Sequence, residues 1–574
     1  MSDKLQSGSP RLRESIARLE RYRQGKRRLD ARLYDEAMWW QSRHETAPAE
    51  GDSRRSGKPV SAWLFNSICN KHADLCDRMP VCTALPREPG DRADAALLSA
   101  VLPVVAARCR LKKTYSDNAW IKLRHGTAVY GVFWNPALEN GIGDIDIRRV
   151  DILNLFWEPG VTDIQDSPHL YLVGLEDRAA LESRYPVLAE AVRQGRLDPD
   201  STPADGASLL GSGGSYLLRE RDGCPEKYTV VDWYYRKALP DGRTVLHYAK
   251  YVGDILLYAS ENDPACAERG WYDHGLYPFV PDVLFPEADS PAGYGLIAVG
   301  RNPQGYIDEL DGHILEYANW ASRVRYWAKR SLGINEKEFL DPDRRIIQVE
   351  GDMDEEKLRQ ITLSPMDGML SEVRQMKIEE LKETTGTRDV NQGMSGGVTA
   401  ASAITALQEA GDKSSRDCVS GSYRAYVAVM EQVVELIRQF YTGTRCFRIA
   451  GDGGWKYIRY SNRGLRDRVT GTDAAGNPLR RRPVFDIDVR AERENPLDRA
   501  GRNELMLSLF RAGMFDPDRR AAAALALSDM DFDGIDALRA AVAPAAGAAV
   551  APAAVATVAP AAVATVAPTA GDSE

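Results

Sequence analysis

The sequence predicts an α+β protein in which long helices alternate with groups of short strands. Two long segments, 303–332 and 365–385, carry apolar residues at spacings of three and four, which is typical of amphipathic helices. A third segment of this kind, 399–441, follows a glycine-rich stretch. Alternating apolar and polar residues, as in 144–150 and 484–492, indicate strands on both sides of the helices.

The first long helix is expected to begin at Asn302-Pro303 and to end near Gly333. Roughly 30 residues with a rise of about 1.5 Å each make a rod of about 45 Å. A rod with an apolar face needs a neighbour that covers it. The apolar residues on one face of this rod are Ile307, Leu310, Ile314, Tyr317, Ala321, Val324 and Ala328.

A short insert separates the first two helices and contains one strand-like run, Arg345 to Val349. Acidic residues are dense in the insert. A run of carboxylates is usually a solvated face, and a Mg²⁺ site is the alternative interpretation. The run consists of Asp352, Asp354, Glu355 and Glu356.

The second and third helices flank the glycine-rich loop. Ser364-Pro365-Met366-Asp367 combines a cap, a proline at the first helical position and an acid near the positive end of the helix dipole, so it predicts a helix start. This helix should run to Gly386. Thr399 is expected to cap the third helix. Its apolar face consists of Val419, Tyr423, Tyr426, Val427, Met430, Val433, Val434, Ile437 and Phe440.

Mixed helices and strands precede the first rod. Helices are expected from Ser61 to just before Pro80 and as one run from Arg92 to Arg124. Ahead of them, residues 11–45 form a basic amphipathic stretch. We interpret it as a helix that docks through Leu12, Ile16, Leu19, Met38 and Trp39, with binding of nucleic acid or another anionic partner as the alternative. Further strands are expected at Ala128–Trp134, 227–237, 243–251 and 253–259, and a flexible linker at 198–215.

The C-terminal part begins with strands near 446–460 and continues into a helix around Leu505, Leu509 and Phe510. The sequence AAVATVAP then occurs twice in succession, and the run from Ala540 to Ala570 carries no charge. Its length makes a membrane span the alternative to consider, but regularly spaced prolines break the helical hydrogen-bond ladder. We therefore predict a disordered tail.

Composition limits the possible functions. The formal net charge of −9 argues against a protein that grips DNA through a general phosphate-neutralising surface. Eight cysteines are scattered without a CxxC pair, which predicts free thiols in a reducing compartment. Met1 to Arg28 is charged throughout and does not resemble a signal peptide, so we expect synthesis in the cytosol.

One enzymatic signature occurs, because Gly393 to Gly397 satisfies G-x-S-x-G with Ser395 as the nucleophile. That motif requires a buried strand before it and a histidine after it. Residues 385–392 are too polar for such a strand, and all seven histidines precede Ser395. The sequence also lacks a Walker A motif, an HExxH pair and a Cys/His cluster. We therefore predict no catalysis, no cofactor and no bound metal.

The order of rod, small insert, rod, glycine-rich loop and long helix resembles the core of the portal proteins of tailed bacteriophages. The resemblance spans about residues 60–540, and the aromatic-acid-Pro turn and aspartate-rich bend within 151–173 add to it. By this resemblance the chain divides into an N-terminal basic helix and linker (1–60), a mixed α/β wing (61–302), stem helix 1 (303–332), a small α/β clip (333–364), stem helix 2 (365–385), a tunnel loop (386–398), the long wing helix with strands (399–494), a helical crown (495–542) and the disordered Ala/Pro/Val tail (543–574).

The resemblance implies a ring, expected to be a dodecamer, at one vertex of the capsid. Double-stranded DNA would pass through the ring without sequence readout during packaging and ejection. The expected partners are the large subunit of terminase, the major capsid and scaffolding proteins and a neck or tail adaptor, with no membrane. The protein would reside in the virion after assembly in the host cytoplasm.

The resemblance also assigns candidate site residues. Arg388, Asn391, Gln392 and Ser395 belong to the tunnel loop and would face the DNA channel, with a surface loop that makes no DNA contact as the alternative. Arg344, Arg345, Asp352 and Asp354 belong to the clip and would face terminase or the adaptor. The alternative functions are a coiled-coil scaffold or adaptor and a serine hydrolase that uses Ser395. Glycines at 333 and 386 interrupt the heptad register and disfavour a continuous coil.

Overall fold

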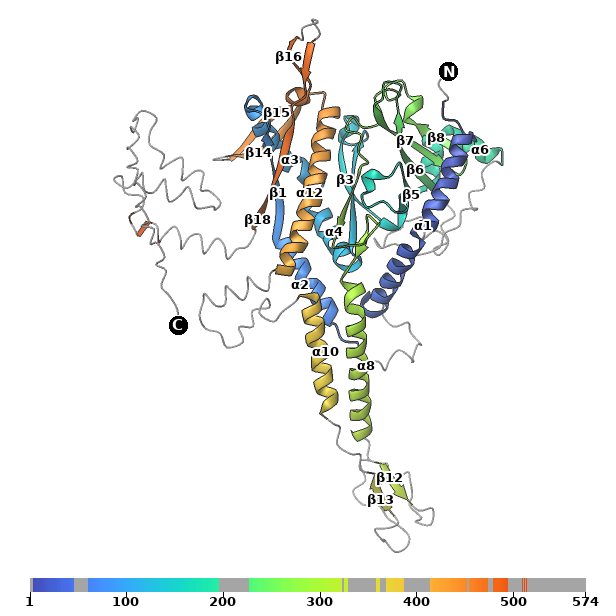
Figure 1. Ribbon diagram of the computed structural model, residues 1–574, viewed down its shortest axis with the longest axis vertical. Helices are drawn as coiled ribbons and strands as arrows, with labels where there is room; N and C mark the ends of the chain where they lie inside the picture. The colour runs from blue at the N-terminus through green and yellow to red at the C-terminus, as the bar shows by residue number, and fades with distance from the viewer. Residues whose placement is uncertain are drawn as a thin grey trace, which may run out of the picture. The chain divides into compact units, whose positions relative to one another are not determined.

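The structure is a computed structural model (Figure 1). It describes residues 4–45, 60–195, 227–322, 325–328, 358–361, 368–386, 413–451, 454–472 and 478–493, together with Ser508, Phe510, Arg511 and Gly513. The chain separates into two compact units, Met1–Glu492 and Arg493–Glu574. Nearly all described residues belong to the first unit. This unit contains both helices and strands, as expected of the predicted α+β class.

The largest sheet has five antiparallel strands in the order β4-β5-β6-β7-β8. Aromatic side chains fill one of its faces, where the rings of Trp233 and Tyr235 stack at a centroid distance of 4.2 Å. Such pairs add stabilisation beyond the area they bury. The strand bounds are β4 Leu155–Phe156, β5 His169–Asp177, β6 Lys227–Ala238, β7 Thr244–Val252 and β8 Ile255–Ala259.

The basic N-terminal segment forms helix α1, Pro10–Trp40, with a π-helical turn at Gln41–Glu45. Ser9 accepts a hydrogen bond from the backbone N–H of Leu12 and caps the helix. The helix contacts the five-stranded sheet, because Ser15 Oγ lies 3.3 Å from Tyr171 Oη and the Tyr22 ring packs edge-on against the Tyr171 ring. The predicted docking of this segment is therefore confirmed. No observation tests whether its outer face binds an anion.

The opposite face of the same sheet is covered by two short helices, α5 (Arg178–Arg184) and α6 (Pro186–Arg193). Leu181 and Leu188 are buried there against Val230 and Val252. The sheet is thus buried on both faces.

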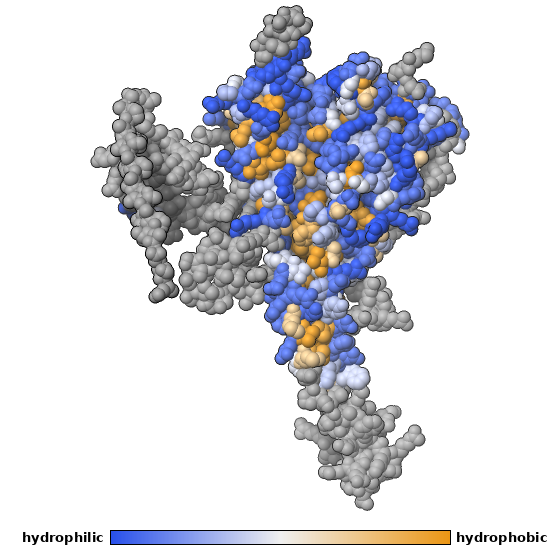
Figure 2. Space-filling view, in the orientation of Figure 1, coloured by the Kyte–Doolittle hydropathy of each residue, from blue (hydrophilic) through white to orange (hydrophobic). Residues whose placement is uncertain are grey.

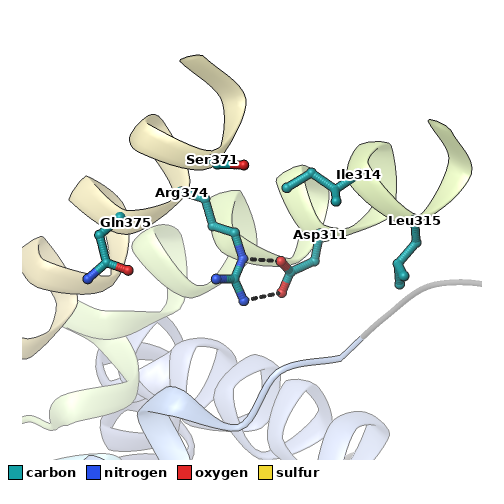
Figure 3. A pocket seen from close by; sticks show the side chains of 6 residues that line it. All are labelled: Asp311, Ile314, Leu315, Ser371, Arg374 and Gln375. Carbon is teal, nitrogen blue, oxygen red and sulfur yellow. Dashed lines mark hydrogen bonds and ion pairs between the residues drawn. The ribbon is translucent and has the colours of Figure 1, made fainter. Parts of the chain in front are cut away.

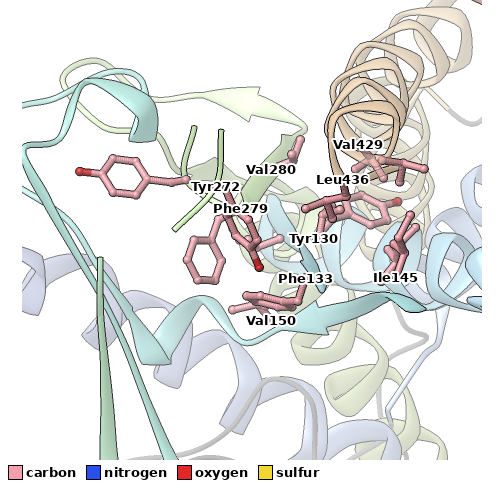
Figure 4. Close-up of a cluster of buried hydrophobic side chains, with 14 of the residues drawn as sticks. Tyr130, Phe133, Ile145, Val150, Tyr272, Phe279, Val280, Val429 and Leu436 are labelled. Atoms are coloured by element: carbon pink, nitrogen blue, oxygen red, sulfur yellow. The ribbon is translucent and has the colours of Figure 1, made fainter. Parts of the chain in front are cut away.

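A three-stranded antiparallel sheet, in the order β3-β2-β9, lies beside the long helix α12, Lys413–Phe440. Its strands are β3 Asp144–Val150, β2 Thr127–Asn135 and β9 Phe279–Val283. Figure 4 shows how side chains of this sheet, among them Tyr130, Ile145 and Val280, approach Val429 and Leu436 of the helix. This contact forms the centre of the main hydrophobic core.

Three further helices precede this sheet: α2 (Trp63–Asp77), α3 (Arg92–Arg108) and α4 (Leu111–His125). The prediction of one helical run from Arg92 to Arg124 was wrong. The run breaks at Arg110, which adopts a left-handed conformation with φ 54°. The break lets α3 and α4 pack on different partners, since α3 contacts β1 (Arg78–Pro86) and α4 contacts α2 and β2.

The helix predicted over 303–332 requires correction at both ends. Helix α8 spans Leu296–Ser322, so Pro303 lies inside the helix and does not begin it. Residues Arg325–Ala328 are strand β12, which pairs antiparallel with β13, Leu358–Ile361. Pairing between segments far apart in the sequence overrides the local helical periodicity at 325–328. This strand also excludes a continuous coil from 303 to 385.

The second predicted rod is helix α10, Met369–Thr385, which ends at Gly386 with φ 66°. A left-handed glycine is the usual helix C-terminus, so the predicted stop is confirmed. The predicted strand run Arg345 to Val349, the linker 198–215, most of the predicted crown and the tail 543–574 lie outside the described residues.

Small two-stranded sheets complete the first unit. Strand β1 pairs with β18 (Phe485–Arg493), as the alternating pattern at 484–492 predicted for a strand there. The other pairs are β10 (Phe285–Pro286) with β11 (Gly293–Tyr294), β14 (Arg445–Gly451) with β15 (Gly454–Tyr460), and β16 (Arg468–Thr472) with β17 (Pro478–Arg481).

Candidate functional site at the two-helix stem

The helices α8 and α10 lie side by side and together make the element that we call the stem (Figure 1). Their upper ends are anchored in a hydrophobic cluster. Ile307 of α8 and Ile378 and Leu381 of α10 are buried there with Leu64 and Ile68 of α2. Gly300 permits the close approach of α8, because a Cβ atom at this position would lie 2.6 Å from Leu64 Cδ1.

Polar contacts hold the same end of α8 in place. The backbone N–H of Leu64 donates to Gln304 Oε1 at 3.0 Å. Asp308 accepts a hydrogen bond from the backbone N–H of Ser61 at 3.1 Å and pairs with Arg43 at 2.5 Å. Burial and fixed hydrogen bonds therefore give this end of the stem one orientation relative to α2.

A buried contact between a glutamate and a histidine connects the N-terminal helix α1 to α4. Glu36 Oε2 of α1 lies 3.3 Å from His125 Nδ1 of α4. Burial raises the pKa of Glu36 to about 7, partly offset by Arg32 and Arg301, and burial lowers the pKa of His125 to about 3. The pair is consequently a neutral histidine beside a carboxyl that titrates near neutral pH.

Further along, the two stem helices are joined by an ion pair. Arg374 of α10 donates to Asp311 of α8 through Nε and, at 3.4 Å, through Nη2 (Figure 3). The pair borders a hollow of about 510 Å³ that is also lined by Ile314, Ser371 and Gln375. Figure 3 shows Ile314 directed toward the α10 side and Leu315 directed away from it.

Large apolar side chains are exposed on the stem. We call them the stem apolar band, and Figure 2 shows apolar surface at this level. Isolated exposed apolar residues are common, but five on this pair of helices require an explanation. The exposed fractions are Tyr306 55%, Leu315 51%, Trp320 47%, Met369 58% and Met376 58%.

The start of α12 is held by a buried ion pair. Lys122 Nζ of α4 lies 2.6 Å from Asp282 Oδ1 of β9 and 2.8 Å from Ser422 Oγ of α12. Ser422 donates in turn to Asp282 Oδ2 at 2.9 Å. Neither charge is accessible to solvent, since the side chains of Lys122 and Asp282 are 0% and 1% exposed. A charge at this depth is tolerated because it is fully paired.

The structure does not test the predicted site residues. Arg388, Asn391, Gln392 and Ser395 of the tunnel loop lie outside the described residues, as do Arg344, Arg345, Asp352 and Asp354 of the clip. The flanking elements are described. Ala328 pairs with Leu358, so the two chain ends that bracket residues 329–357 lie next to each other.

Sequence reasoning missed the exposure of the stem apolar band. It predicted a helix through Met369, Leu370, Val373, Met376 and Leu381 but did not say which of these side chains would be exposed, and both methionines are exposed. The spacing of seven residues between Met369 and Met376 was an available signal for a second apolar stripe.

Two features are absent from the described part of the chain, a membrane-spanning helix and a group of metal-binding side chains. None of its helices is long and apolar enough to span a membrane. Its histidine, cysteine, aspartate and glutamate side chains form no group of three or more that could hold a metal ion.

Comparisons with known proteins were made for the whole chain. A search of curated proteins found no match. Among solved structures, a chain from the virion of a native gene transfer agent particle is similar with 10% sequence identity and a TM-score of 0.33, covering 85% of this chain and 98% of that chain. A TM-score of this size does not establish a common fold.

The family comparison gives a match in the second half of the chain. Residues 324–569 match the family model of the phage P22-like portal protein. That family is a structural family, and its members are components of the phage particle. The matched range includes β13, α10 and α12, which are part of the core that carried the resemblance in the sequence. The match confirms the predicted resemblance to portal proteins over residues 324–569, which is less than half of the chain.

Proposed function

We propose that the chain assembles into a ring at one capsid vertex, and that double-stranded DNA is packaged and ejected through this ring. The stem apolar band carries the proposal. A stem of two helices in one subunit leaves these side chains in water, and a neighbouring stem would cover them. A cyclic head-to-tail contact closes on itself and covers the band in every subunit.

The charge of the stem fits a channel wall. Acidic residues outnumber basic ones on α8 and α10 taken together. Phosphates are repelled by such a wall, so DNA would slide and not adhere. The chain itself would hydrolyse no ATP, and the terminase motor would supply the work.

The experiment is a charge substitution in the band. Leu315→Glu with Met376→Glu should convert the ring into smaller species, because each subunit interface would then bury two unpaired carboxylates. Sedimentation velocity and negative-stain imaging of the full chain measure the outcome. Val187→Glu is the matched control, since Val187 on α6 is 53% exposed but lies outside the stem. Rings that persist in the double variant, or a wild-type chain that is monomeric, would contradict the proposal.

We also propose that the tunnel loop contacts the passing DNA. Arg388 would contribute one positive charge per subunit, and Asn391, Gln392 and Ser395 would make short-lived polar contacts. Such contacts would be free of base readout. Removal of residues 392–396 should leave the ring intact and shorten the packaged genome. Packaging and retention of a full-length genome by this variant would favour a surface loop without DNA contact.

The clip is proposed to dock terminase and the neck or tail adaptor. Arg344 and Arg345, with Asp352 and Asp354, would form the contact. Arg344→Glu with Arg345→Glu should preserve ring formation and impair DNA packaging. Normal packaging by this variant would remove the arginines from the contact. Binding of scaffolding and major capsid proteins, and assembly in the host cytoplasm, belong to the same proposal.

A further inference from the structure

A cysteine, a histidine and a serine converge at the C-terminal end of α2. His72 and Cys76 lie one helical turn apart, and Cys76 Sγ is 3.5 Å from His72 Nε2. Ser116 of α4 completes the group, with its Oγ 3.5 Å from Cys76 Sγ and 3.2 Å from His72 Nε2. The His72 ring is positioned from two sides, because Nε2 lies 3.0 Å from the carbonyl oxygen of Ser116 and the ring packs edge-on against Trp120.

This arrangement shifts the pKa of both Cys76 and His72. Burial raises the pKa of the Cys76 thiol, but hydrogen bonds from His72 and Ser116 and the positive charges of His72 and Lys112 outweigh burial, and the pKa lies below its ordinary value. The hydrogen bond to Cys76 raises the pKa of His72, and burial only partly opposes this. The two shifts have the same cause, the close contact between the Cys76 sulfur and the His72 ring.

The other described cysteines have no such surroundings. Burial raises the pKa of the thiols of Cys69, Cys266 and Cys418, and it raises those of Cys82 and Cys109 to about 11 and about 12. Cys446 is exposed and provides the reference for an accessible cysteine. Cys76 is half-buried, and its accessibility to a small reagent is part of what the alkylation experiment measures.

We propose that Cys76 is a thiol-modification site, activated by His72 and Ser116, for soft electrophiles and for disulfides of small thiols. With a disulfide, the Cys76 thiolate attacks one sulfur and a new S–S bond forms. The S–S bond of the reagent breaks, and the second sulfur leaves as a thiolate that takes a proton from water. The exchange consumes one reagent disulfide and forms one mixed disulfide, so it needs no further oxidant. The modified side chain would lie between α2 and α4, next to the helices that anchor the stem.

The test measures alkylation of each cysteine in the native full-length protein. Iodoacetamide is added below stoichiometry, and mass spectrometry of peptides gives the rate at each position. In this reaction the thiolate forms a C–S bond and iodide leaves. Cys76 should react about five-fold faster than Cys446 at pH 7, and the midpoint of its rate against pH should lie below that of an ordinary thiol.

Two variants separate activation from simple access. His72→Gln and Ser116→Ala should each slow alkylation of Cys76 and raise its pH midpoint, while the rate at Cys446 stays unchanged. His313→Gln is the control, because His313 is an exposed histidine of α8. Thermal unfolding of each variant establishes that it is folded. The proposal is overturned if Cys446 reacts faster than Cys76, or if neither variant changes the rate at Cys76.

Discussion

Helices α12 and α8 are similar in length, with 28 and 27 residues, but their apolar faces have different surroundings. In α12, Val429, Met430, Val433, Leu436 and Ile437 are all 0% exposed. In α8, no residue beyond Ile307 is buried. An apolar stripe in the sequence therefore predicts a helix. Whether the stripe is covered within one subunit depends on the elements that pack against it.

The neighbours differ in a simple way. Helix α12 packs against β2, β9 and α2, so several elements meet its apolar face. Within the described residues, the distal part of α8 packs against α10, and the ion pair of Arg374 with Asp311 joins the two helices. The core around α12 is therefore covered within one chain, and the stem is expected to gain its remaining burial from a neighbour. Four measurements would test this difference between α12 and α8.

The largest effect is expected from the buried ion pair of Lys122 with Asp282. Lys122→Met leaves Asp282 charged and buried, which should lower the free energy of unfolding by about 3–5 kcal/mol. Chemical denaturation measures the change. The double variant Lys122→Met with Asp282→Leu removes both charges and should recover much of the loss. A loss below about 1 kcal/mol in the single variant would contradict a fully buried pair.

A matched pair of truncations compares the two helices directly. Leu436→Ala removes a side chain that is 0% exposed in α12 and should cost about 2–5 kcal/mol. Leu315→Ala makes the same chemical change at the exposed stem and should cost less than about 1 kcal/mol in the dissociated subunit. Equal costs in dissociated subunits would show that the stem is already packed within one chain.

Acid should destabilise the protein through His169 on strand β5. Burial lowers the pKa of His169 to about 4, and the charges of Arg18 and Arg11 act in the same direction. The indole N–H of Trp233 donates to Nδ1 at 3.1 Å, and the Arg18 guanidinium faces Nε2, so a second proton on the ring finds no acceptor.

Because the unfolded chain binds a proton near pH 6.5 and the folded chain does not, the stabilisation is complete above about pH 6.5. It declines as the pH falls toward about 4, with a slope of at most about 1.4 kcal/mol per pH unit. Denaturation midpoints between pH 7 and 4 measure this slope, and His169→Gln should reduce it. Glu36→Gln is the opposing control, because a carboxyl with a raised pKa favours folding at lower pH. An unchanged slope in His169→Gln would assign the acid sensitivity to other groups.

The smallest effect is expected from the ion pair of the stem. The side chains of Arg374 and Asp311 are 32% and 16% exposed, and pairs that are open to water contribute about 0–1 kcal/mol. Arg374→Ala should therefore change the unfolding free energy of the subunit by less than about 1 kcal/mol. Added salt should reduce the effect further. A loss near that of Lys122→Met would show that the pair of Arg374 with Asp311 is shielded from solvent as strongly as the pair of Lys122 with Asp282.

Much of the fold could be predicted from local patterns. The alternation at 144–150 predicted β3 with the bounds that the structure shows, and Gly386 marked the end of α10. The break at Arg110 could not be predicted, because an arginine in the left-handed region is held there by the packing of α3 and α4 and not by its own preference. The end of α8 at Ser322 was missed because β12 exists only through its pairing with β13.

The candidate site was predictable in part. The order of elements was sufficient for the resemblance to portal proteins, which the family match over residues 324–569 confirms. The assignments of Arg388 to the channel and of Arg344 to the clip stay predictions. The group of His72, Cys76 and Ser116 had only one visible signal, the spacing of four between a histidine and a cysteine, because Ser116 comes from another helix.

The type and order of most elements follow from the sequence, because the spacing of apolar residues over a few neighbouring positions favours either a helix or a strand. Only the tertiary structure decided which apolar faces are covered and which charges are paired. Lys122 meets Asp282 across 160 positions of the chain and Ser422 across 300. No local sequence pattern predicts these contacts, because they depend on how separate helices and strands pack together in space.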